Sequence, residues 1–281
     1  MPELPEVETV VRGLRPHLLG RRIREARVLS PTVCSIDPEA LRSTRVEELA
    51  RRGKYVLMHL RRGRRRPVLE FHLGMSGQLL IVAEAEPTDK HVHLVLRFQG
   101  MREDMRFRDM RKLGEACSYP SAEELDRQLL SRLGPEADAV TTTELARAAW
   151  SSSRPIKPLL MVQERIAGLG NIYADEALWH AQIHPLRPSD SLSSTELGRL
   201  AHTIRSVLRD AILDRGSSVD DFRGPDGAPG RYQQRHAVYG REGEACPRCG
   251  RPISRIKLQG RSAHFCPHCQ PLPTSGGGDA D

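Results

Sequence analysis

Apolar residues recur at helical spacing near the beginning of the chain. A helix that begins near Pro5 and stops near Gly20 would carry on one face Val7, Val10, Val11, Leu14 and Leu18. Short apolar segments follow and are separated by turn residues, at 55–60, 68–73, 79–82, 93–98 and 104–107. This spacing is typical of antiparallel strands. The first 120 residues therefore predict a β-sandwich or barrel with one opening helix.

The pattern becomes helical after residue 120. Helices are predicted at 123–130, 142–149, 157–166 and 174–180, and a tight turn at 168–171 precedes the last of them. A capping box at Ser193–Glu196 opens a longer amphipathic helix that ends near Gly216. Residues 217–235 are rich in Gly, Asp and Pro and predict a long loop of the kind that is often functional. The segment 271–281 has the composition of a disordered tail.

Four of the six cysteines form two C-x-x-C units near the C-terminus, and sixteen residues separate the units. The four candidate ligands are Cys246, Cys249, Cys266 and Cys269. Four thiolates at this spacing complete the tetrahedral shell of one Zn²⁺. A closed shell leaves no position for a reacting water, so we expect a structural zinc that holds a hairpin.

The other two cysteines and the histidines near the zinc are not expected to bind metal. We interpret Cys34 and Cys117 as small buried side chains, and His264 and His268 as surface residues near the zinc. The elements together predict an α+β chain in four segments, namely 1–120, 121–238, 239–270 with the cysteines, and the tail 271–281.

The charge balance favours a polyanionic partner. Lys and Arg total 43 against 36 for Asp and Glu, which gives a net charge of +7. Eight of these cations lie between Arg51 and Arg66. No apolar run of about 18 residues exists and the first residues lack the pattern of a signal peptide, so we expect a cytoplasmic protein with no membrane span.

The first residues have unusual chemistry for the start of a helix. Proline and acidic residues in a first helical turn have a simple structural interpretation, because the positive end of the helix dipole favours acids. However, removal of Met1 would expose Pro2 as a free secondary amine. An α-amino group has a pKa of about 7.7–8.0, so part of it is unprotonated near neutral pH. Such an amine can attack a carbon centre and form an iminium, and Glu3 beside it could move protons.

Four motifs occur together and in order. They are PELPEVET at Pro2–Thr9, HLGMSG at His72–Gly77, GLGNIYADE at Gly168–Glu176, and the four cysteines. Over nearly the whole chain, from Pro2 to Cys269, the sequence resembles the formamidopyrimidine-DNA glycosylases, within a wider group that includes endonuclease VIII. The resemblance implies an N-terminal β-sandwich, a helix–two-turn–helix domain and a zinc-finger hairpin.

The resemblance also implies an activity. The chain would remove oxidised purines, such as 8-oxoguanine and formamidopyrimidines, from double-stranded DNA during base excision repair. Pro2 would attack the sugar carbon C1′, and Glu3 would transfer protons at the opening sugar. Lys54 would aid β-elimination, and Arg261 would clamp the phosphate and assist δ-elimination. A monomer that associates with the nucleoid through DNA is the expected form.

Further residues match DNA-contacting positions of the family. The matched residues are Met75, His91, Arg111, Leu113, Lys157 and Asn171. Met75, Arg111 and Leu113 would fill the gap left by a base that is flipped out of the duplex. The segment Asp109–Gly114 reads DMRKLG, whereas the family typically has DPRRFG. Leu113 can wedge between bases but cannot stack as a ring does, which leaves lesion preference and opposite-base discrimination open.

Two alternatives remain at this point. One is an endonuclease VIII-like glycosylase for oxidised pyrimidines, which the altered wedge keeps open. The other is a non-catalytic, zinc-stapled protein that senses damaged DNA. The intact set of Pro2, Glu3, Lys54 and Arg261 argues against the second alternative.

Overall fold

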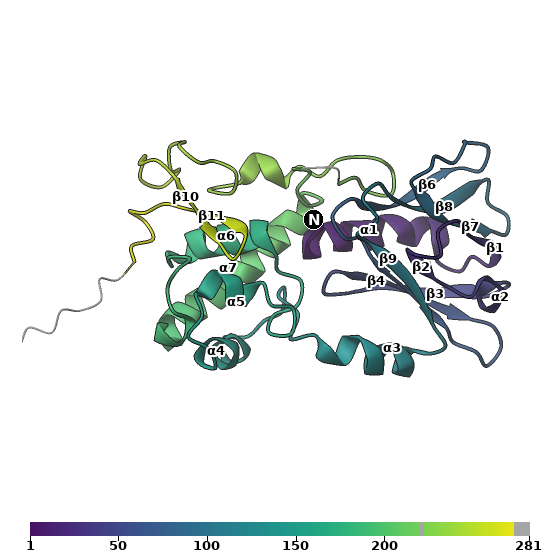
Figure 1. Cartoon of the computed structure of the whole chain (residues 1–281), viewed down its shortest axis with the longest axis horizontal. Helices are drawn as coiled ribbons and strands as arrows, with labels where there is room; N and C mark the ends of the chain where they lie inside the picture. Colours follow the sequence, from purple (N-terminus) through teal and green to yellow (C-terminus); the bar gives the residue numbers. More distant parts are fainter. Residues whose placement is uncertain (220–221, 273–281) are drawn as a thin grey trace, which may run out of the picture. The chain divides into compact units, whose positions relative to one another are not determined.

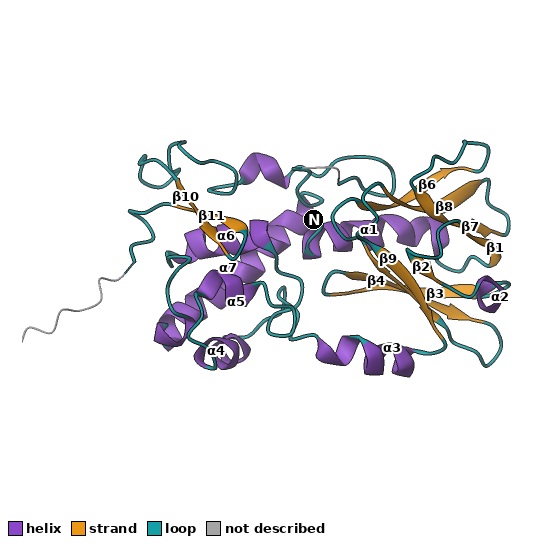
Figure 2. Cartoon of the chain, viewed as in Figure 1, coloured by secondary structure: helices purple, strands orange, loops and turns teal. Residues whose placement is uncertain are grey.

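The structure is a computed structural model that describes residues 1–219 and 222–272. It divides into two compact units, of which unit 1 comprises Met1–Arg132 and Ala211–Gln233, and unit 2 comprises Leu133–Asp210 and Gln234–Asp281. Strands dominate unit 1 and helices dominate unit 2, as Figure 2 shows. The predicted α+β class is confirmed. Most of the predicted disordered tail, from residue 273 on, lies outside the described residues.

Unit 1 contains two β-sheets. The four-stranded sheet has the order β1-β7-β8-β6, with bounds Ile23–Val28, Val92–Phe98, Glu103–Asp109 and Gly77–Ala83. The five-stranded sheet has the order β2-β9-β5-β4-β3, with bounds Cys34–Ser35, Glu115–Tyr119, Val68–His72, Tyr55–Arg61 and Arg45–Arg52. All pairs are antiparallel except β2 with β9. Two short helices, α2 (Pro38–Leu41) and α3 (Ala122–Gln128), complete the unit.

The opening helix α1 (Leu4–Leu18) packs its apolar face into the core that the two sheets share (Figure 1). Its inward residues are fully buried and are those that the periodicity selected. Burial of each such side chain contributes roughly 1.5–3 kcal/mol. The helix ends close to the predicted stop, where Gly20 has a positive φ of 79° and donates to Val46 O. The start of α1 is therefore anchored to a rigid core.

The apolar pattern predicted the strands β4 to β8 but missed β1, β2, β3 and β9. Both β1 and β3 contain a bulge, between Ile23 and Glu25 and between Val46 and Glu48 respectively. An extra residue in one strand shifts the inward and outward positions, so the alternation that identifies a strand is lost. The strand β9 is short and carries Cys117, which is only partly buried, whereas Cys34 in β2 is buried as expected.

Unit 2 is built from helices and one hairpin. The helices are α4 (Thr142–Trp150), α5 (Ile156–Leu160), α6 (Asn171–Ala181) and most of α7 (Ser194–Leu213), and the hairpin strands are β10 (Ser254–Leu258) and β11 (Arg261–Phe265). The predicted capping box is confirmed, because Ser193 N donates to Glu196 at 2.8 Å and Glu196 N donates to Ser193 Oγ at 3.3 Å. Among the described helices, none combines the length and apolarity needed to cross a bilayer.

The prediction of a helix over residues 157–166 is wrong in its second half, because α5 ends at Leu160. The side chain of Gln163 organises the residues that follow. Its amide nitrogen donates to Met161 O and to Leu169 O, both at 2.9 Å, and its oxygen accepts from Gly168 N at 2.9 Å. The first of these bonds satisfies the Met161 carbonyl, which a continued helix would have paired, and the other two shape the turn that leads into α6.

A carboxyl group is buried on the outer face of the five-stranded sheet. Glu70 in β5 is 1% exposed and alternates along the strand with the core residues Leu69 and Phe71. Its Oε1 has no hydrogen-bond partner among the described residues. Burial, and secondarily the charge of Glu115, raise the pKa of Glu70 to about 8 from 4.5. The folded protein therefore holds a proton here that the unfolded chain releases at a lower pH.

This burial predicts that Glu70→Gln stabilises the protein at high pH. Since the folded-state pKa exceeds the unfolded one, the contribution of Glu70 is fully present below about pH 4.5 and is lost as the pH rises toward 8. The amide stays neutral, so the stability gain should grow to roughly 5 kcal/mol by pH 9, at about 1.4 kcal/mol per unit of pKa difference. Denaturant unfolding at pH 5, 7 and 9 measures it. The exposed Glu103→Gln is the control, and a gain that does not grow with pH would contradict the assignment.

Candidate active site and zinc centre

The first residues of the chain are fixed in place, unlike most chain termini. Pro2 and Glu3 are buried directly before α1. The carboxylate of Glu6 accepts from Glu3 N at 2.8 Å and from Ser217 N at 2.6 Å. Gly216 allows this approach, because a β-carbon there would lie 2.5 Å from Glu6 Oε1. The candidate nucleophile is thus held by both α1 and the segment that follows α7.

Lys54 lies in the two-residue turn that joins β3 to β4, next to Gly53 with a positive φ of 56°. The side chain is 6% exposed. The pKa of His72 is lowered to about 4, mainly by burial and secondarily by the charge of Lys54. A neutral imidazole therefore lies beside the lysine side chain. Glu8 of α1 accepts a hydrogen bond from Arg51 Nε at 3.2 Å. This contact ties α1 to the strand that carries the Lys54 turn.

The three candidate wedge residues come from two turns that pack backbone to backbone. Gly74, with a φ of 58°, lies so close to the second turn that a β-carbon would be 2.4 Å from the carbonyl carbon of Leu113. Met75 and Leu113 remain 40% and 52% exposed, and Arg111 is also exposed. Large apolar side chains rarely remain exposed in adjacent turns without a partner to contact. The structure therefore brings Met75, Arg111 and Leu113 together.

A single carboxylate organises the second turn. Asp109 accepts hydrogen bonds from Ser76 Oγ at 2.5 Å, Arg111 N at 3.1 Å, Leu113 N at 2.8 Å and Gly114 N at 2.7 Å. Burial opposes ionisation of Asp109, but these hydrogen bonds outweigh it and hold the pKa below its ordinary value. The turn is thus preorganised by a charged acceptor that bridges to the first turn through Ser76.

Two histidines support the same turn. The fully buried His93 lies 2.9 Å from Ser30 Oγ and 2.8 Å from Asp109 O through its two ring nitrogens. The carbonyl oxygen of His91 accepts from Asp109 N at 2.9 Å. His91, a candidate DNA contact, therefore lies beside the wedge turn. Sequence reasoning gave no role to Asp109, Ser76 or His93, although the first two stand inside the quoted motifs.

Asn171 is the first residue of α6, after Gly170 as N-cap. Its Oδ1 is buried and has no hydrogen-bond partner among the described residues. The free amide groups of a helix N-terminus favour a phosphate or another anion. The turn that Gln163 shapes delivers Asn171 to this position.

Lys157 is buried in an ion-pair network. Its ammonium group lies 2.7 Å from Asp175 Oδ1 and also donates to Ser262 O, and its side chain is 1% exposed. Asp175 Oδ2 accepts from His264 N at 2.9 Å and lies 3.2 Å from His264 Nδ1. The expectation that His264 is a surface residue is wrong, whereas His268 is exposed as expected. The network joins α5 and α6 to β11.

Arg261 lies at the tip of the β10–β11 hairpin. Leu258 pairs with Arg261, so Gln259 and Gly260 form a two-residue turn, and both have positive φ values, 46° and 80°. The guanidinium group of Arg261 is exposed and forms no ion pair with the described residues. A cation presented in this way is suited to a phosphate.

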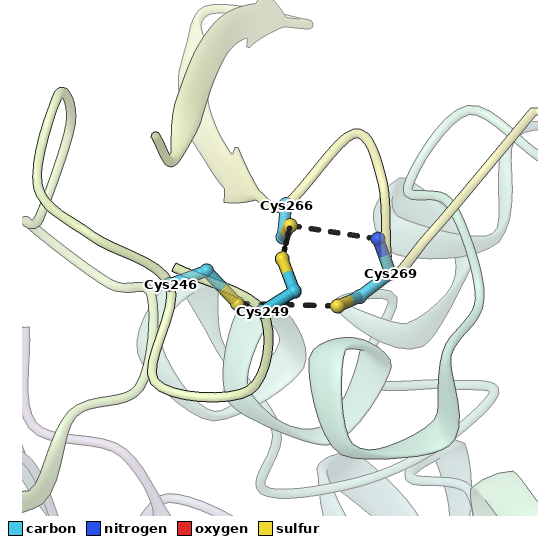
Figure 3. Close-up of side chains that lie close together, drawn as sticks. All are labelled: Cys246, Cys249, Cys266 and Cys269. Atoms are coloured by element: carbon cyan, nitrogen blue, oxygen red, sulfur yellow. Dashed lines mark hydrogen bonds between the residues drawn. The ribbon is translucent and has the colours of Figure 1, made fainter. Parts of the chain in front are cut away.

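The four predicted zinc ligands converge (Figure 3). The Sγ atoms of Cys246 and Cys269 are 4.0 Å apart, those of Cys249 and Cys266 are 3.5 Å apart, and all four lie within 4.8 Å of one another. A tetrahedral zinc with Zn–S bonds of about 2.3 Å requires sulfur atoms about 3.8 Å apart. The residues present therefore fit one structural zinc.

Contacts from α6 fix the zinc-binding segment. Glu176, fully buried, accepts hydrogen bonds from the three successive amides of Ala237, Val238 and Tyr239, at 2.8 to 3.0 Å. The guanidinium of Arg248, between the first two cysteines, lies 4.2 Å from the ring centre of Trp179. The two adjacent acids of the GLGNIYADE motif thus bind different segments. Asp175 contacts the β10–β11 hairpin, and Glu176 binds the backbone amides of residues 237–239 before it.

The candidate residues are divided between the two units. Unit 1 holds Pro2, Glu3, Lys54, Met75, His91, Arg111 and Leu113, and unit 2 holds Lys157, Asn171, Arg261 and the four cysteines. Within unit 1, the N-terminal segment is tied to the strand before Lys54, and the wedge residues share two facing turns. Within unit 2, the buried network connects Lys157 to the hairpin that carries Arg261.

Three family models match successive parts of the chain. They are described as the formamidopyrimidine-DNA glycosylase N-terminal domain (residues 1–116), the H2TH domain of the same enzymes (residues 133–223) and a zinc finger found in FPG and IleRS (residues 243–272). The chain is 42% identical over 282 residues to the formamidopyrimidine-DNA glycosylase of Herpetosiphon aurantiacus, with 96% of this chain and 100% of the relative covered. The enzyme of the same name from Thermus thermophilus is 43% identical, with 96% and 98% covered.

Solved structures agree with the sequence comparisons. The crystal structure of MutM (Fpg) from Thermus thermophilus has a TM-score of 0.86 at 41% identity and covers 97% of this chain and 100% of that chain. A Lactococcus lactis Fpg mutant in complex with Fapy-dG containing DNA has a TM-score of 0.88 at 33% identity, with 96% and 100% covered. The fold and the four-thiolate centre define a DNA repair glycosylase with a zinc finger. The chain belongs to the formamidopyrimidine-DNA glycosylase family.

Proposed function

We propose that Pro2 is the nucleophile of this enzyme once Met1 has been removed. The chain is a base-excision-repair glycosylase with AP lyase activity that acts on oxidised purines in double-stranded DNA. The observation that supports the proposal most strongly is the fixed start of the chain. The carboxylate of Glu6 accepts hydrogen bonds from the backbone amides of both Glu3 and Ser217. A preorganised amine loses little freedom on attack, which lowers the barrier.

The proposed chemistry proceeds through an iminium. The lone pair of the Pro2 nitrogen forms a bond to C1′, and the bond between C1′ and the damaged base breaks with a proton supplied to the base. Glu3, directly adjacent, transfers protons as the sugar ring opens. Breakage of the C1′–O4′ bond, with a proton delivered to O4′, leaves the iminium between Pro2 and C1′. Loss of the C2′ proton then expels the 3′ phosphate, and loss of the C4′ proton expels the 5′ phosphate. Lys54 aids the first elimination, and Arg261 binds the phosphate during the second.

The exposed side chains of Met75, Arg111 and Leu113 could stabilise a duplex from which the damaged nucleotide has been flipped out. A flipped nucleotide leaves unstacked neighbours at a cost of a few kcal/mol. We propose that Met75, Arg111 and Leu113 enter the gap and that His91 contacts the backbone beside them. Asn171 would bind phosphate at the start of α6. Lys157 would act near the lesion through the hairpin that it fixes, because its ammonium group is already paired with Asp175.

Leu113→Phe is expected to tighten binding to a duplex that contains an abasic-site analogue. An aromatic side chain stacks on bases with roughly 1–3 kcal/mol per base, which an aliphatic wedge cannot match. We expect about tenfold higher affinity in a direct binding titration. The matched control Leu113→Ile changes the shape without adding a ring and should leave the affinity within a factor of two or so. Equal affinity for Phe and wild type would mean that residue 113 does not contact the bases.

A substrate panel tests the proposed function. Single-turnover cleavage is measured on duplexes with 8-oxoguanine, a formamidopyrimidine or an oxidised pyrimidine, each placed opposite all four bases. We expect the oxidised purines to be cleaved much faster. Preference for the pyrimidine would favour the endonuclease VIII-like alternative, and binding without cleavage of any lesion would favour the non-catalytic alternative.

Several finer assignments complete the proposal. We propose that the chain has four segments, 1–120, 121–238, 239–270 and 271–281. This division follows the order of the sequence and differs from the two compact units described above. We also propose that the enzyme acts as a monomer in the cytoplasm, at the nucleoid. The support for the location is that solved relatives bind damaged DNA. When bound, the single zinc stabilises the hairpin that presents Arg261 and takes no part in the bond changes.

A further inference from the structure

An arginine-rich hairpin joins β4 to β5. Arg62 and Arg65 exchange backbone hydrogen bonds at 3.0 and 3.1 Å, so Gly63 and Arg64 form a two-residue turn, with Gly63 at a φ of 62°. The arginine hairpin, as we call it, consists of residues 61–66 and contains five arginines and one glycine. The turn therefore holds several positive charges close together in space.

Few acids neutralise this charge. Glu47 pairs with Arg61 at 3.1 Å and, more distantly, with Arg66 at 3.9 Å, and the carboxylate of Glu123 in α3 interacts electrostatically with Arg66. Arg66 is 66% exposed, and Arg64 and Arg65 are also exposed. Among the described residues, the side chains of Arg64 and Arg65 have no hydrogen-bond or ion-pair partner.

The strand pairing places like charges opposite one another. Arg45 pairs with Arg61 across β3 and β4, and Arg62 faces Arg65 within the hairpin. Like charges in directly opposed positions destabilise a sheet. A polyanion would relieve this repulsion, and guanidinium groups bind phosphates through paired hydrogen bonds.

The arginine hairpin lies far from the reaction centre within unit 1. Lys54 precedes β4 and the hairpin follows it, so the seven residues Tyr55–Arg61 separate them. At about 3.3 Å per residue this is roughly 23 Å along the strand. The hairpin is therefore remote from the nucleotides that Lys54 serves.

We infer that the arginine hairpin binds the phosphate backbone of a second DNA duplex while the first is engaged at the catalytic end. The enzyme then passes directly from one segment to another during its search. This inference rests on the DNA binding of the proposed function. It adds a second site for DNA that the chemistry of base removal does not require.

Direct transfer is measured from the dissociation rate of a preformed complex. The protein is bound to a short labelled duplex with an abasic-site analogue, and unlabelled duplex is added at increasing concentration. We expect the rate for wild type to rise linearly with competitor. The triple variant Arg64→Ala, Arg65→Ala, Arg66→Ala should lose most of this slope. If three phosphates are neutralised, the wild-type slope should fall about 40-fold between 50 and 200 mM salt.

The control variant removes the same charge elsewhere in unit 1, with Arg24→Ala, Arg27→Ala and Arg102→Ala, all of them exposed. It should keep the wild-type slope. Single-turnover base removal on the short duplex should be unchanged in both variants, which separates failure of this inference from failure of the proposed function. A wild-type rate that is independent of competitor, or an unchanged slope in the hairpin variant, would overturn the inference.

Discussion

Pro2→Gly is expected to reduce single-turnover base removal by at least about 10³-fold. The substitution replaces a secondary amine, which forms a charged iminium directly, by a primary amine with a freely rotating backbone. It also loosens the residue that Glu6 positions through the neighbouring amide of Glu3. Rapid-quench cleavage of an 8-oxoguanine duplex measures the rate, and borohydride trapping measures the covalent intermediate. Both should fall together.

Two further variants separate the chemistry of Pro2 from its effect on the helix. Pro5→Gly removes a buried proline from the first turn of the same helix α1 and should leave the rate within about tenfold. Glu3→Gln keeps the nucleophile but removes the proton-transfer group, for which a loss of roughly 10²–10⁴-fold is expected. If Pro5→Gly were as damaging as Pro2→Gly, the effect would be one of folding rather than of nucleophilic attack.

Loss of zinc is the second prediction with a large effect. Cys266→Ser opens the four-thiolate shell, and a structural zinc in a small finger contributes about 10–16 kcal/mol to folding of that element. The hairpin that presents Arg261 should then lose its order. We expect strand cleavage to fall by at least about 100-fold, together with loss of bound metal. Metal analysis and gel-based cleavage assays measure both quantities.

The chain offers a matched control for this experiment. Cys117→Ser removes a thiol that lies on β9 of unit 1 and outside the cysteine cluster. It should retain one zinc and near wild-type cleavage. Full cleavage by a metal-free Cys266→Ser protein would show that the hairpin is held without zinc, through contacts such as Asp175 with His264.

The sequence predicted those features whose signal is local. The helical spacing of Val7 to Leu18 defined α1, and the capping box of Ser193 with Glu196 defined the start of α7. The C-x-x-C spacing specified all four zinc ligands, because thiolate chemistry leaves few other interpretations. Of the candidate catalytic residues, Pro2, Glu3 and Lys54 are buried in the structure, and Arg261 is exposed at the tip of the β10–β11 hairpin.

Features that depend on tertiary contacts were missed. The bulges of β1 and β3 removed the alternation by which strands are recognised. Gln163 ended α5 early by bonding backbone groups of a turn that only the folded chain forms. His264 is buried because Asp175 of α6 accepts its hydrogen bonds, and no local pattern reveals a partner 89 residues away. The support that Asp109 gives to the wedge turn is of the same kind.

The most direct test of the central claim is to identify the residue that is linked to DNA after borohydride trapping. The wild-type enzyme is trapped on an 8-oxoguanine duplex, digested, and the modified peptide is sequenced by mass spectrometry. We predict that the sugar remnant is on the amino group of Pro2, in a peptide that lacks Met1. A remnant on the side chain of Lys54 would contradict the account, because the catalytic amine would then belong to the β3–β4 turn.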